Sequence, residues 1–336
     1  MARLTLLIPG LLDGTASDAV GGHTPALARL LGRARLEKAP AADRASLLAH
    51  QFGVVGEAHL PVAALTRLAD TGEADGCWLR ADPVHLQADL SQVLLSPQPL
   101  GDLDAADATA LVASLNESFR ELGWTFDVPH PQRWYLRLDA PPDICTHPLQ
   151  QVRGRDIHPF LPEGADARVW RSRLNEIQML LFDHPVNRQR EARGQVPVNS
   201  VWFWGEGTLP EKARSPAMEV HGAGPLLRGL ARVSGAELHP PPASAADWRQ
   251  AGGGDSLVVL DDLTDAAADP PGAWLAALAR LERDWFAPLL ADLQRGRLRE
   301  LVLHPADGRV YRLGPARSWR LWQRPRDLPG AVGEAP

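Results

Sequence analysis

The sequence predicts an α/β fold built around a central, mostly parallel sheet. Residues Leu4–Ile8 form an apolar run that stops at Pro9-Gly10, which is typical of a strand buried on both faces of a parallel sheet. A second buried run begins at Leu257 and leads into an acidic loop. The chain has 336 residues and exceeds the usual domain size of roughly 100 to 200 residues, so an inserted lobe or a second domain is expected.

Helices and strands follow one another in the first half of the chain. Thr24 as N-cap and Pro25 at the first helical position predict a short helix that Gly32 ends. Residues 104–123 carry leucines and a phenylalanine at helical spacing and finish with a glycine, so they predict a helix facing a core. The alternating run at 134–138 predicts a strand.

The second half continues with longer helices. An apolar stripe from residue 166 predicts a helix that ends near His184. Residues 239–255 are rich in Pro, Ala and Gly and predict a flexible surface connection. The run 273–295 predicts a long helix with a kink at Pro288. Near the end, ELVLHPADGRVYRL predicts a hairpin, and the period-two alternation of SWRLW predicts extended structure.

Composition narrows the possible partners and compartments. A formal charge of -6 gives no electrostatic reason to expect a nucleic acid. No segment approaches the roughly 20 apolar residues that cross a bilayer, so no membrane partner is expected. Cys77 and Cys145 have neither disulfide-framework nor zinc-site spacing, which favours a reducing, cytoplasmic location. The short apolar start is interpreted as a strand, with a signal peptide as the alternative.

One long segment carries a resemblance to known proteins. Residues 183–207 read DHPVNRQREARGQVPVNSVWFWGEG, which resembles the archaeal-type, cofactor-independent phosphoglycerate mutase family in its His-Pro-x-Asn, Arg, Gly and final Gly-x-Gly. The wording VNSVWFWGEG is similar to RpfE-type bacterial regulatory proteins. HTPALARLL, PLLRGLARVSGAEL and LVVLDDLTDAAAD add thinner matches elsewhere. The resemblance implies a main body of the phosphoglycerate mutase/alkaline phosphatase type at 1–137 and 208–325, with a smaller α+β middle lobe at 138–207.

The same resemblance implies two divalent metal ions, manganese or zinc, that activate a serine for phosphoryl transfer. Such a centre needs several carboxylates and histidines to hold both cations. Pro9 stands where the family has a metal-binding Asp, with Asp13 a few residues further on. Asp265 survives without the family's His, and His304 and Asp307 occur in the wrong order. The sequence therefore predicts a dismantled metal centre.

Two interpretations of these acidic residues remain open. The family's Gly-Ser-Asp nucleophile also has no counterpart between residues 45 and 65. With the metal centre dismantled, no cofactor is expected. Under the alternative of an active enzyme, Mn or Zn is required. The catalytic candidates are then Asp13, Asp265 and His304, and the metal candidates are Asp13, Asp261, Asp265, His304 and Asp307. Asp261 and its neighbour Asp262 otherwise simply end a buried strand and cap the next turn.

A second group of polar residues lies in the text RADPVHLQAD. Asp82, His85 and Asp89 have spacings of three and four, so a helix would stack them on one face, where they could hold a cation or tune the imidazole. The alternative is that Asp82 and Pro83 start a helix whose other polar residues are solvated. The residues alone favour this alternative, whereas the resemblance favours ligand contact.

The signature segment offers further candidates for anion binding. The guanidinium of Arg188 and the amide of Asn187 could contact a carboxylate or phosphate, although Asn187 and His184 could equally fix the turn. Asn199 lies within an apolar strand, so its amide must find partners if it is buried. Together with the Arg-Gly run near residue 228, the candidate ligand contacts are Asp82, His85, His184, Asn187, Arg188, Asn199 and Arg228.

These observations lead to one predicted function and two alternatives. The prediction is a catalytically degenerate, phosphoglycerate mutase-like regulatory protein that binds a small anionic metabolite or a protein partner. The first alternative is an active metal-dependent mutase or phosphatase, for which Asp265 and His304 would be essential. The second is an interaction scaffold without a ligand site.

Overall fold

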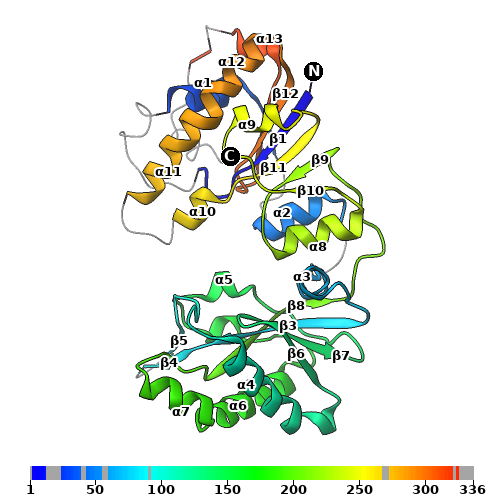
Figure 1. The fold of residues 1–336 in the computed structure, drawn as a ribbon, viewed down its shortest axis with the longest axis vertical. Coiled ribbons are helices and arrows are strands. Elements are labelled where there is room, and N and C mark those ends of the chain that lie inside the picture. Colours follow the sequence, from blue (N-terminus) through cyan, green and yellow to red (C-terminus); the bar gives the residue numbers. More distant parts are fainter. Residues whose placement is uncertain are drawn as a thin grey trace. The chain divides into compact units, whose positions relative to one another are not determined.

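The computed structural model describes residues 2–12, 24–38, 43–54, 60–89, 92–266, 272–320 and 323–324. The chain divides into two compact units (Figure 1). The main unit comprises Met1–Val55 and Lys212–Pro336, and the inserted unit comprises Gly56–Glu211. Each unit has its own sheet and its own hydrophobic core.

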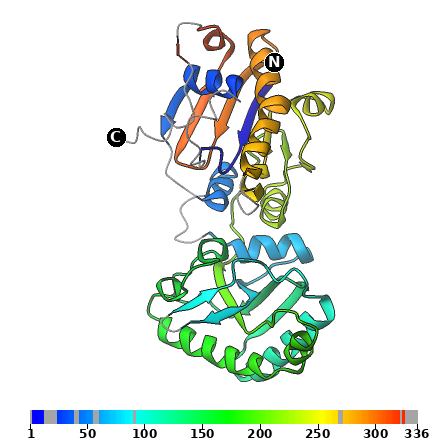
Figure 2. The same ribbon diagram turned by 90° about the vertical axis from the view of Figure 1, so that its left-hand side faces the viewer.

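The main unit contains a seven-stranded sheet in its described residues, with the order β10-β9-β11-β1-β12-β13-β2 (Figures 1 and 2). The strands are β1 (Ala2–Leu7), β2 (Arg35–Lys38), β9 (Glu219–His221), β10 (Leu238–His239), β11 (Ser256–Val259), β12 (Leu298–His304) and β13 (Arg309–Leu313). The five strands from β10 to β12 are parallel, and β13 and β2 add an antiparallel edge. This mostly parallel α/β sheet confirms the predicted fold class.

The centre of the sheet follows directly from the apolar runs. Leu6 of β1 is aligned with Val258 on one side and Leu303 on the other. All three side chains are buried, because both faces of a parallel sheet are covered by its crossover helices. The predicted hairpin is also present, since β12 and β13 pair antiparallel around the turn.

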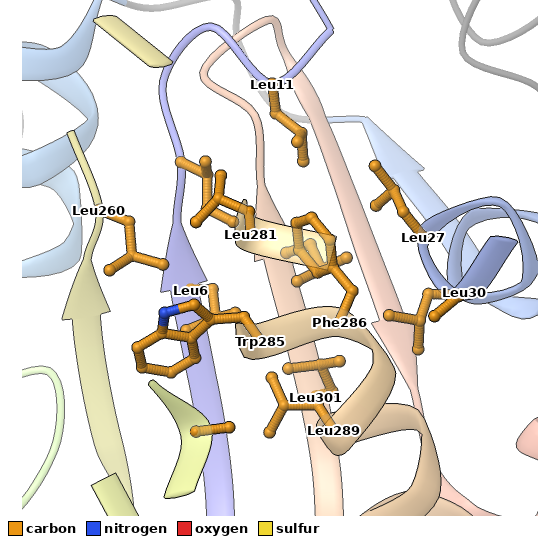
Figure 3. Packing of buried hydrophobic residues seen from close by; sticks show 14 of the residues in the cluster. Leu6, Leu11, Leu27, Leu30, Leu260, Leu281, Trp285, Phe286, Leu289 and Leu301 are labelled. Atoms are coloured by element: carbon orange, nitrogen blue, oxygen red, sulfur yellow. The ribbon is translucent and has the colours of Figure 1, made fainter. Parts of the chain in front are cut away.

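Helices cover both faces of this sheet. They are α1 (Pro25–Arg33), α2 (Arg44–Gln51), α8 (Pro225–Ser234), α9 (Ala245–Gln250), α10 (Asp262–Ala266), α11 (Ala273–Leu281), the π-helical turn η3 (Glu282–Phe286), α12 (Ala287–Gln294) and α13 (Pro315–Ser318). Figure 3 shows Leu6 and Leu301 of the sheet packing against Trp285, Phe286 and Leu289 from the π-turn and α12. Helices α2 and α8 contact each other on the opposite face.

The irregularity predicted at Pro288 is a π-helical turn at Glu282–Phe286. Proline has no N–H to offer to the preceding turn, and the helix widens just before it. The buried Glu282 carboxylate accepts hydrogen bonds from the backbone N–H groups of Ala26 at 2.6 Å and Leu27 at 3.0 Å. A residue distant in sequence therefore caps the amino end of α1, after the predicted N-cap Thr24.

The inserted unit contains an antiparallel four-stranded sheet with the order β6-β7-β3-β8. Its strands are β3 (Cys77–Val84), β6 (Thr125–His130), β7 (Arg133–Leu138) and β8 (Ser200–Gly207), and β4 (Leu86–Ala88) pairs separately with β5 (Val93–Leu95). Its helical segments are α3 (Val62–Thr71), α4 (Ala105–Ser118), η1 (Arg120–Leu122), α5 (Leu149–Val152), η2 (His158–Phe160), α6 (Ala167–Phe182) and α7 (Pro185–Ala192).

The two faces of this sheet differ in chemistry. Leu79, Leu136 and Phe203 point into an apolar core shared with α4 and α6. On the opposite face, Trp78 and Tyr135 pack against α3, and β3 also carries the charged Arg80 and Asp82 there. Side chains alternate along a strand, so one strand contributes to an apolar core and a polar face at once.

The structure divides the chain differently from the sequence-based boundaries. The inserted unit begins at Gly56, not at residue 138. Strand β3, at residues 77–84, lies between β7 and β8. The residues from Gly56 to 137 therefore belong with the sheet of the inserted unit. The C-terminal boundary near residue 207 lies close to the observed Glu211.

Three local predictions are wrong. Residues 77–84 are a strand, not the start of a helix, and Pro83 is tolerated because β7 pairs only with residues 77–80. The connection at 239–255 contains α9, which is anchored by the buried Trp248. SWRLW, at residues 318–322, is predicted to be extended, but Ser318 is the last residue of α13. Leu321 and Trp322 lie outside the described residues.

Candidate functional site

A cavity of about 590 Å³ lies at the carboxyl edge of the main sheet, beside the end of β11. The chain leaves β9 towards α8 on one face and leaves β11 towards α11 on the other. Ligands of open α/β sheets commonly bind at such a switch in the direction of the connections. The cavity is lined by Ala223, Pro241, Pro242, Ala243, Val259, Leu260, Asp261, Asp262, Arg280, Leu281, Asp284 and Trp285.

The charged side chains of this carboxyl-edge cavity are strongly paired. Asp261 accepts two hydrogen bonds from the Arg44 guanidinium, at 2.6 and 2.5 Å. Asp284 accepts two from Arg283, both at 2.8 Å, and these hold the pKa of its carboxyl below the usual value. Asp262 is exposed at the start of α10. The lining itself therefore contains three carboxylates and the guanidinium of Arg280.

His304 lies at the carboxyl end of β12 and is buried there. Leu303 points into the apolar cluster beneath α12, so the alternation of the strand directs His304 to the opposite face. Burial, reinforced by the nearby Arg312 and His50, lowers the pKa of His304 to about 4. Its imidazole is consequently neutral over the physiological range.

The described donors do not fit a two-metal centre. Among the residues that the structure describes, no group of three or more His, Cys, Asp and Glu side chains converges around a common point. Asp307 pairs with Arg309 in the turn after β12, with Nε 2.6 Å from its carboxylate. Asp13 lies outside the described residues, and for Asp265 the description covers its backbone in α10 but not its side chain.

Asp82 is part of a buried charged network on the polar face of the inserted sheet. Its carboxylate accepts a hydrogen bond from Arg80 Nε at 3.0 Å and another from Trp204 Nε1 at 2.8 Å. Burial raises the pKa of the Asp82 carboxyl, and Arg80 and Trp204 oppose that rise. Asp82 and Arg80 are almost completely buried, so their charges compensate each other within the protein.

A second ion pair lies on the same face. Asp70 of α3 accepts hydrogen bonds from Arg133 Nε at 2.8 Å and from the Tyr135 hydroxyl at 2.7 Å. Although burial raises the pKa of Asp70, these hydrogen bonds outweigh it and hold the pKa below the usual value. The Arg80 guanidinium also lies 5.2 Å from the centre of the Tyr135 ring, which connects the two pairs through a cation–π contact.

His85 and Asn199 hold two chain segments together. His85 Nδ1 lies 2.9 Å from the carbonyl of Pro197. The Asn199 amide accepts from the Leu86 N–H at 2.7 Å and donates to the Leu86 carbonyl at 2.8 Å. The amide thus finds its partner in the backbone and extends the pairing at the end of β3. The predicted stacking of Asp82, His85 and Asp89 on a helix is wrong, because this region is a strand followed by β4.

The signature segment is internally satisfied in the same way. Asn187 donates to the carbonyls of Leu181 and Val198 and accepts from the Val198 N–H, all within 2.9 Å. His184 Nδ1 accepts from the Val186 N–H and caps α7, while its Nε2 lies 3.0 Å from the Ser114 hydroxyl. Burial lowers the pKa of His184. Neutral His184 and buried Asn187 therefore fix the junction between α6, α7 and β8.

The two remaining candidate arginines lie in different units. Arg188 is exposed and 3.2 Å from Asp183 at the end of α6. Arg228 is exposed on α8 of the main unit. The ligand candidates predicted from the sequence thus do not form one cluster within either unit; Asp82, His85 and Asn199 are the ones that lie along connected strands.

Several structurally important charged residues were not predicted from the sequence. Arg190 is fully buried and donates to Asp102 and to the Val196 carbonyl. Arg80 is buried in β3, which also carries the buried Asp82. A charged residue interrupting an apolar run was the available signal for Arg80, because buried charges require partners. Arg44 had no such signal, since its partner Asp261 is distant in sequence.

None of the helices in the described ranges is long and apolar enough to cross a membrane.

No protein-family profile matches the sequence. Curated relatives are 2,3-bisphosphoglycerate-independent phosphoglycerate mutases. The protein of Methanothrix thermoacetophila is 35% identical over 106 residues, 32% of this chain and 25% of the relative. That of Methanosarcina acetivorans is 28% identical over 182 residues, covering 50% of this chain and 45% of the relative. A probable member from Geobacter sulfurreducens is 26% identical over 157 residues, 46% of this chain and 38% of the relative. The matched parts therefore span less than half of each of these relatives.

Solved structures resemble the chain over nearly its whole length. The cofactor-independent phosphoglycerate mutase of Thermoplasma acidophilum has a TM-score of 0.50 at 15% identity and covers all of this chain and 96% of its own. The PH0037 protein of Pyrococcus horikoshii has a TM-score of 0.55 at 12% identity, covering 93% of this chain and 87% of its own. At these identities the likeness shows the fold. Together with the sequence matches, it makes this chain a divergent relative of the cofactor-independent phosphoglycerate mutases.

Proposed function

We propose that this protein is a catalytically degenerate, regulatory relative of the phosphoglycerate mutases that binds a small anionic metabolite. The RpfE-type regulatory character is part of the proposal and rests on the resemblance of the VNSVWFWGEG strand. The proposal assigns ligand binding, not phosphoryl transfer, to the main unit. A regulatory protein partner would then respond to the ligand-bound form.

The ion pair between Asp261 and Arg44 carries the proposal. Asp261 directly follows β11, where the family resemblance implies a metal-binding edge. Both of its carboxylate oxygens accept charged hydrogen bonds from one guanidinium. Such bidentate pairs are strong and directional. A divalent ion coordinated by Asp261 would lie close to the Arg44 charge.

The neighbouring strand ends support the same conclusion. Pro9 follows β1 and has no side-chain donor. His304 ends β12 at the same edge and is buried there. Because no group of three or more His, Cys, Asp and Glu side chains converges among the described residues, the described part of this edge does not supply the ligand set that a two-metal centre needs.

Metal analysis and activity assays test the proposal. The purified protein is assayed for mutase and phosphatase turnover with added Mn²⁺ or Zn²⁺, beside Asp265→Ala and Asp261→Asn. We expect no turnover above the buffer rate in any of the three proteins and less than one tightly bound divalent ion per chain. Two bound ions together with turnover that Asp265→Ala abolishes would establish the active enzyme instead.

Ligand binding separates the metabolite-binding role from a pure scaffold. Phosphorylated and carboxylated metabolites are expected to raise the melting temperature in a concentration-dependent way, because a ligand that binds only the folded state stabilises it. If no anion shifts the melting temperature at millimolar concentration, the protein is a scaffold and its binding partner is another protein.

A further inference from the structure

A second cavity in the main unit lies at the amino edge of the sheet, at the opposite ends of the strands from Asp261. It has a volume of about 340 Å³. Its lining comes from the starts of β1, β11 and β12, the end of α2 and the segment that precedes β9. The lining residues are Arg3, Thr5, Gln51, Ser215, Pro216, Ala217, Met218, Asp255, Ser256, Leu257 and Arg299. This volume suits a small metabolite.

Asp255 positions the two arginines of this amino-edge cavity. Its Oδ1 accepts a hydrogen bond from the Arg3 backbone N–H at 2.7 Å, and its Oδ2 lies 3.3 Å from Arg299 Nη2. The Arg3 side chain extends towards Glu300, with Nε 3.1 Å from that carboxylate. Each guanidinium has five N–H donors, so these contacts leave further donors on Arg299 and Arg3, which both line the cavity.

Neutral donors complete the wall. Thr5 lies in the middle of β1, between Leu4 and Leu6, which both point into the apolar cluster on the other face. The alternation of the strand therefore directs the Thr5 hydroxyl to the cavity side. Gln51 adds an amide at the end of α2. Guanidinium, hydroxyl and amide groups together suit an oxyanion, because all three can donate hydrogen bonds to its oxygens.

Charge distinguishes this cavity from the one at the carboxyl edge. The amino-edge lining contains two guanidinium groups and one carboxylate, an excess of one positive charge. The carboxyl-edge lining contains three carboxylates and one guanidinium, an excess of two negative charges. Ion-pair partners outside the linings reduce both differences: Arg44 and Arg283 pair with Asp261 and Asp284 at the carboxyl edge, and Glu300 pairs with Arg3 at the amino edge. The groups that line the amino-edge cavity remain the more favourable for a small anion.

We infer that the amino-edge cavity is the binding site for the small anionic metabolite, a phosphate ester or a carboxylate, with Arg299, Arg3 and Thr5 as its contacts. The inference rests on the proposed binding function and adds its location and chemistry. It places the ligand away from the edge where the family resemblance implies catalysis. A ligand there acts on the protein by stabilising the starts of β1, β11 and β12.

Calorimetry with inorganic phosphate and with malonate tests the site, against chloride at equal ionic strength. Arg299→Gln is expected to weaken the binding of the preferred anion by about tenfold or more, since it removes a charged hydrogen-bond donor. Thr5→Val keeps the β-branched shape and is expected to weaken binding by roughly threefold to tenfold. The anion that binds more tightly identifies the ligand as a phosphate ester or a carboxylate.

Arg297→Gln provides the matched control, because Arg297 and Arg299 are 62% and 60% exposed and each lies near one aspartate. The control is expected to bind as the wild type does. Equal affinities in Arg297→Gln and Arg299→Gln would overturn the assignment of the site. Anion binding that these variants leave unchanged refutes the site and leaves the proposed binding function standing, whereas turnover in the metal assay refutes that function separately.

Discussion

At the scale of single residues, His304 shows how tertiary surroundings change the chemistry of a side chain. In the sequence it is a candidate metal ligand after an apolar strand. In the structure it is 7% exposed and lies near Arg312 and His50, and burial together with these groups lowers its pKa to about 4. The same histidine is therefore a neutral core residue.

The depressed pKa predicts a pH dependence of stability. In the unfolded chain a histidine has a pKa near 6.5, so between about pH 6.5 and pH 4 the unfolded state binds a proton that the folded state does not. The stabilisation is complete above pH 6.5 and is lost as the pH falls towards 4, by up to about 3 kcal/mol. Chemical denaturation of the wild type and of His304→Gln measures the effect.

We expect the variant to have the flatter profile in this window, with the difference between the two proteins constant above pH 7. Parallel profiles from pH 7 to 4 would mean that His304 binds its proton equally well in both states. Repeating the measurement with a chelator present tests whether the loss of a bound metal ion, instead of the protonation of His304, causes the pH dependence.

At the scale of elements, α1 depends on a carboxylate from another helix. Glu282 lies in the π-helical turn and accepts from the N–H groups of Ala26 and Leu27. A carboxylate at a helix amino end satisfies unpaired N–H groups and interacts favourably with the helix dipole. Sequence capping rules search the few residues before a helix, so they found Thr24 and could not find Glu282.

Removal of this cap is expected to destabilise the main unit. Glu282→Gln keeps one acceptor and should lower the free energy of unfolding by about 1 kcal/mol, and Glu282→Ala by about 2 kcal/mol. The matched control is Glu117→Ala, an exposed glutamate on α4, which should change stability by less than about 0.5 kcal/mol. Equal effects of Glu282→Ala and Glu117→Ala in urea titrations would show that the cap contributes nothing.

Strand β3 shows why element type could not be read from local spacing. The text RADPVHL has an N-cap residue, a proline and polar residues at helical intervals. All residues of Cys77–Val84 are nevertheless buried in a strand that pairs with β8 along most of its length and with β7 at residues 77–80. Arg80 and Asp82 neutralise each other on the polar face. Pairing with distant strands overrides local helix signals.

At the scale of the whole molecule, the two units have separate cores. The cluster around Leu301 belongs to the main unit, and the cluster around Leu136 belongs to the inserted unit. Separate cores can unfold separately, because each is stabilised by its own buried apolar surface.

Core substitutions are therefore expected to act on one unit at a time. Leu136→Ala should cost about 2–5 kcal/mol in the inserted unit, through lost burial and the cavity that it leaves. Hydrogen exchange read by mass spectrometry should then show faster exchange in β3 and β7 with unchanged exchange in β1 and β12. Leu301→Ala should give the reverse pattern. Uniform acceleration across both units in either variant would mean that the chain unfolds as one cooperative body.

The sequence by itself determined the mostly parallel α/β class, the hairpin at the end of the sheet and the ancestry carried by residues 183–207. These features depend on apolar periodicity and on local sequence motifs, which a single sequence displays directly. It also predicted that Asn199 would need a partner, because a buried amide always does.

Only the tertiary structure decided where the inserted unit begins, which charges are paired and which cavities remain. Residues distant in the chain come together in each of these features: the pairing of β3 with β7 and β8, the Asp261–Arg44 ion pair and the linings of the two cavities, whose net charges are opposite. A sequence pattern reports neighbours within a few residues. The contacts that shape these sites join residues far apart in the chain, such as Arg44 and Asp261.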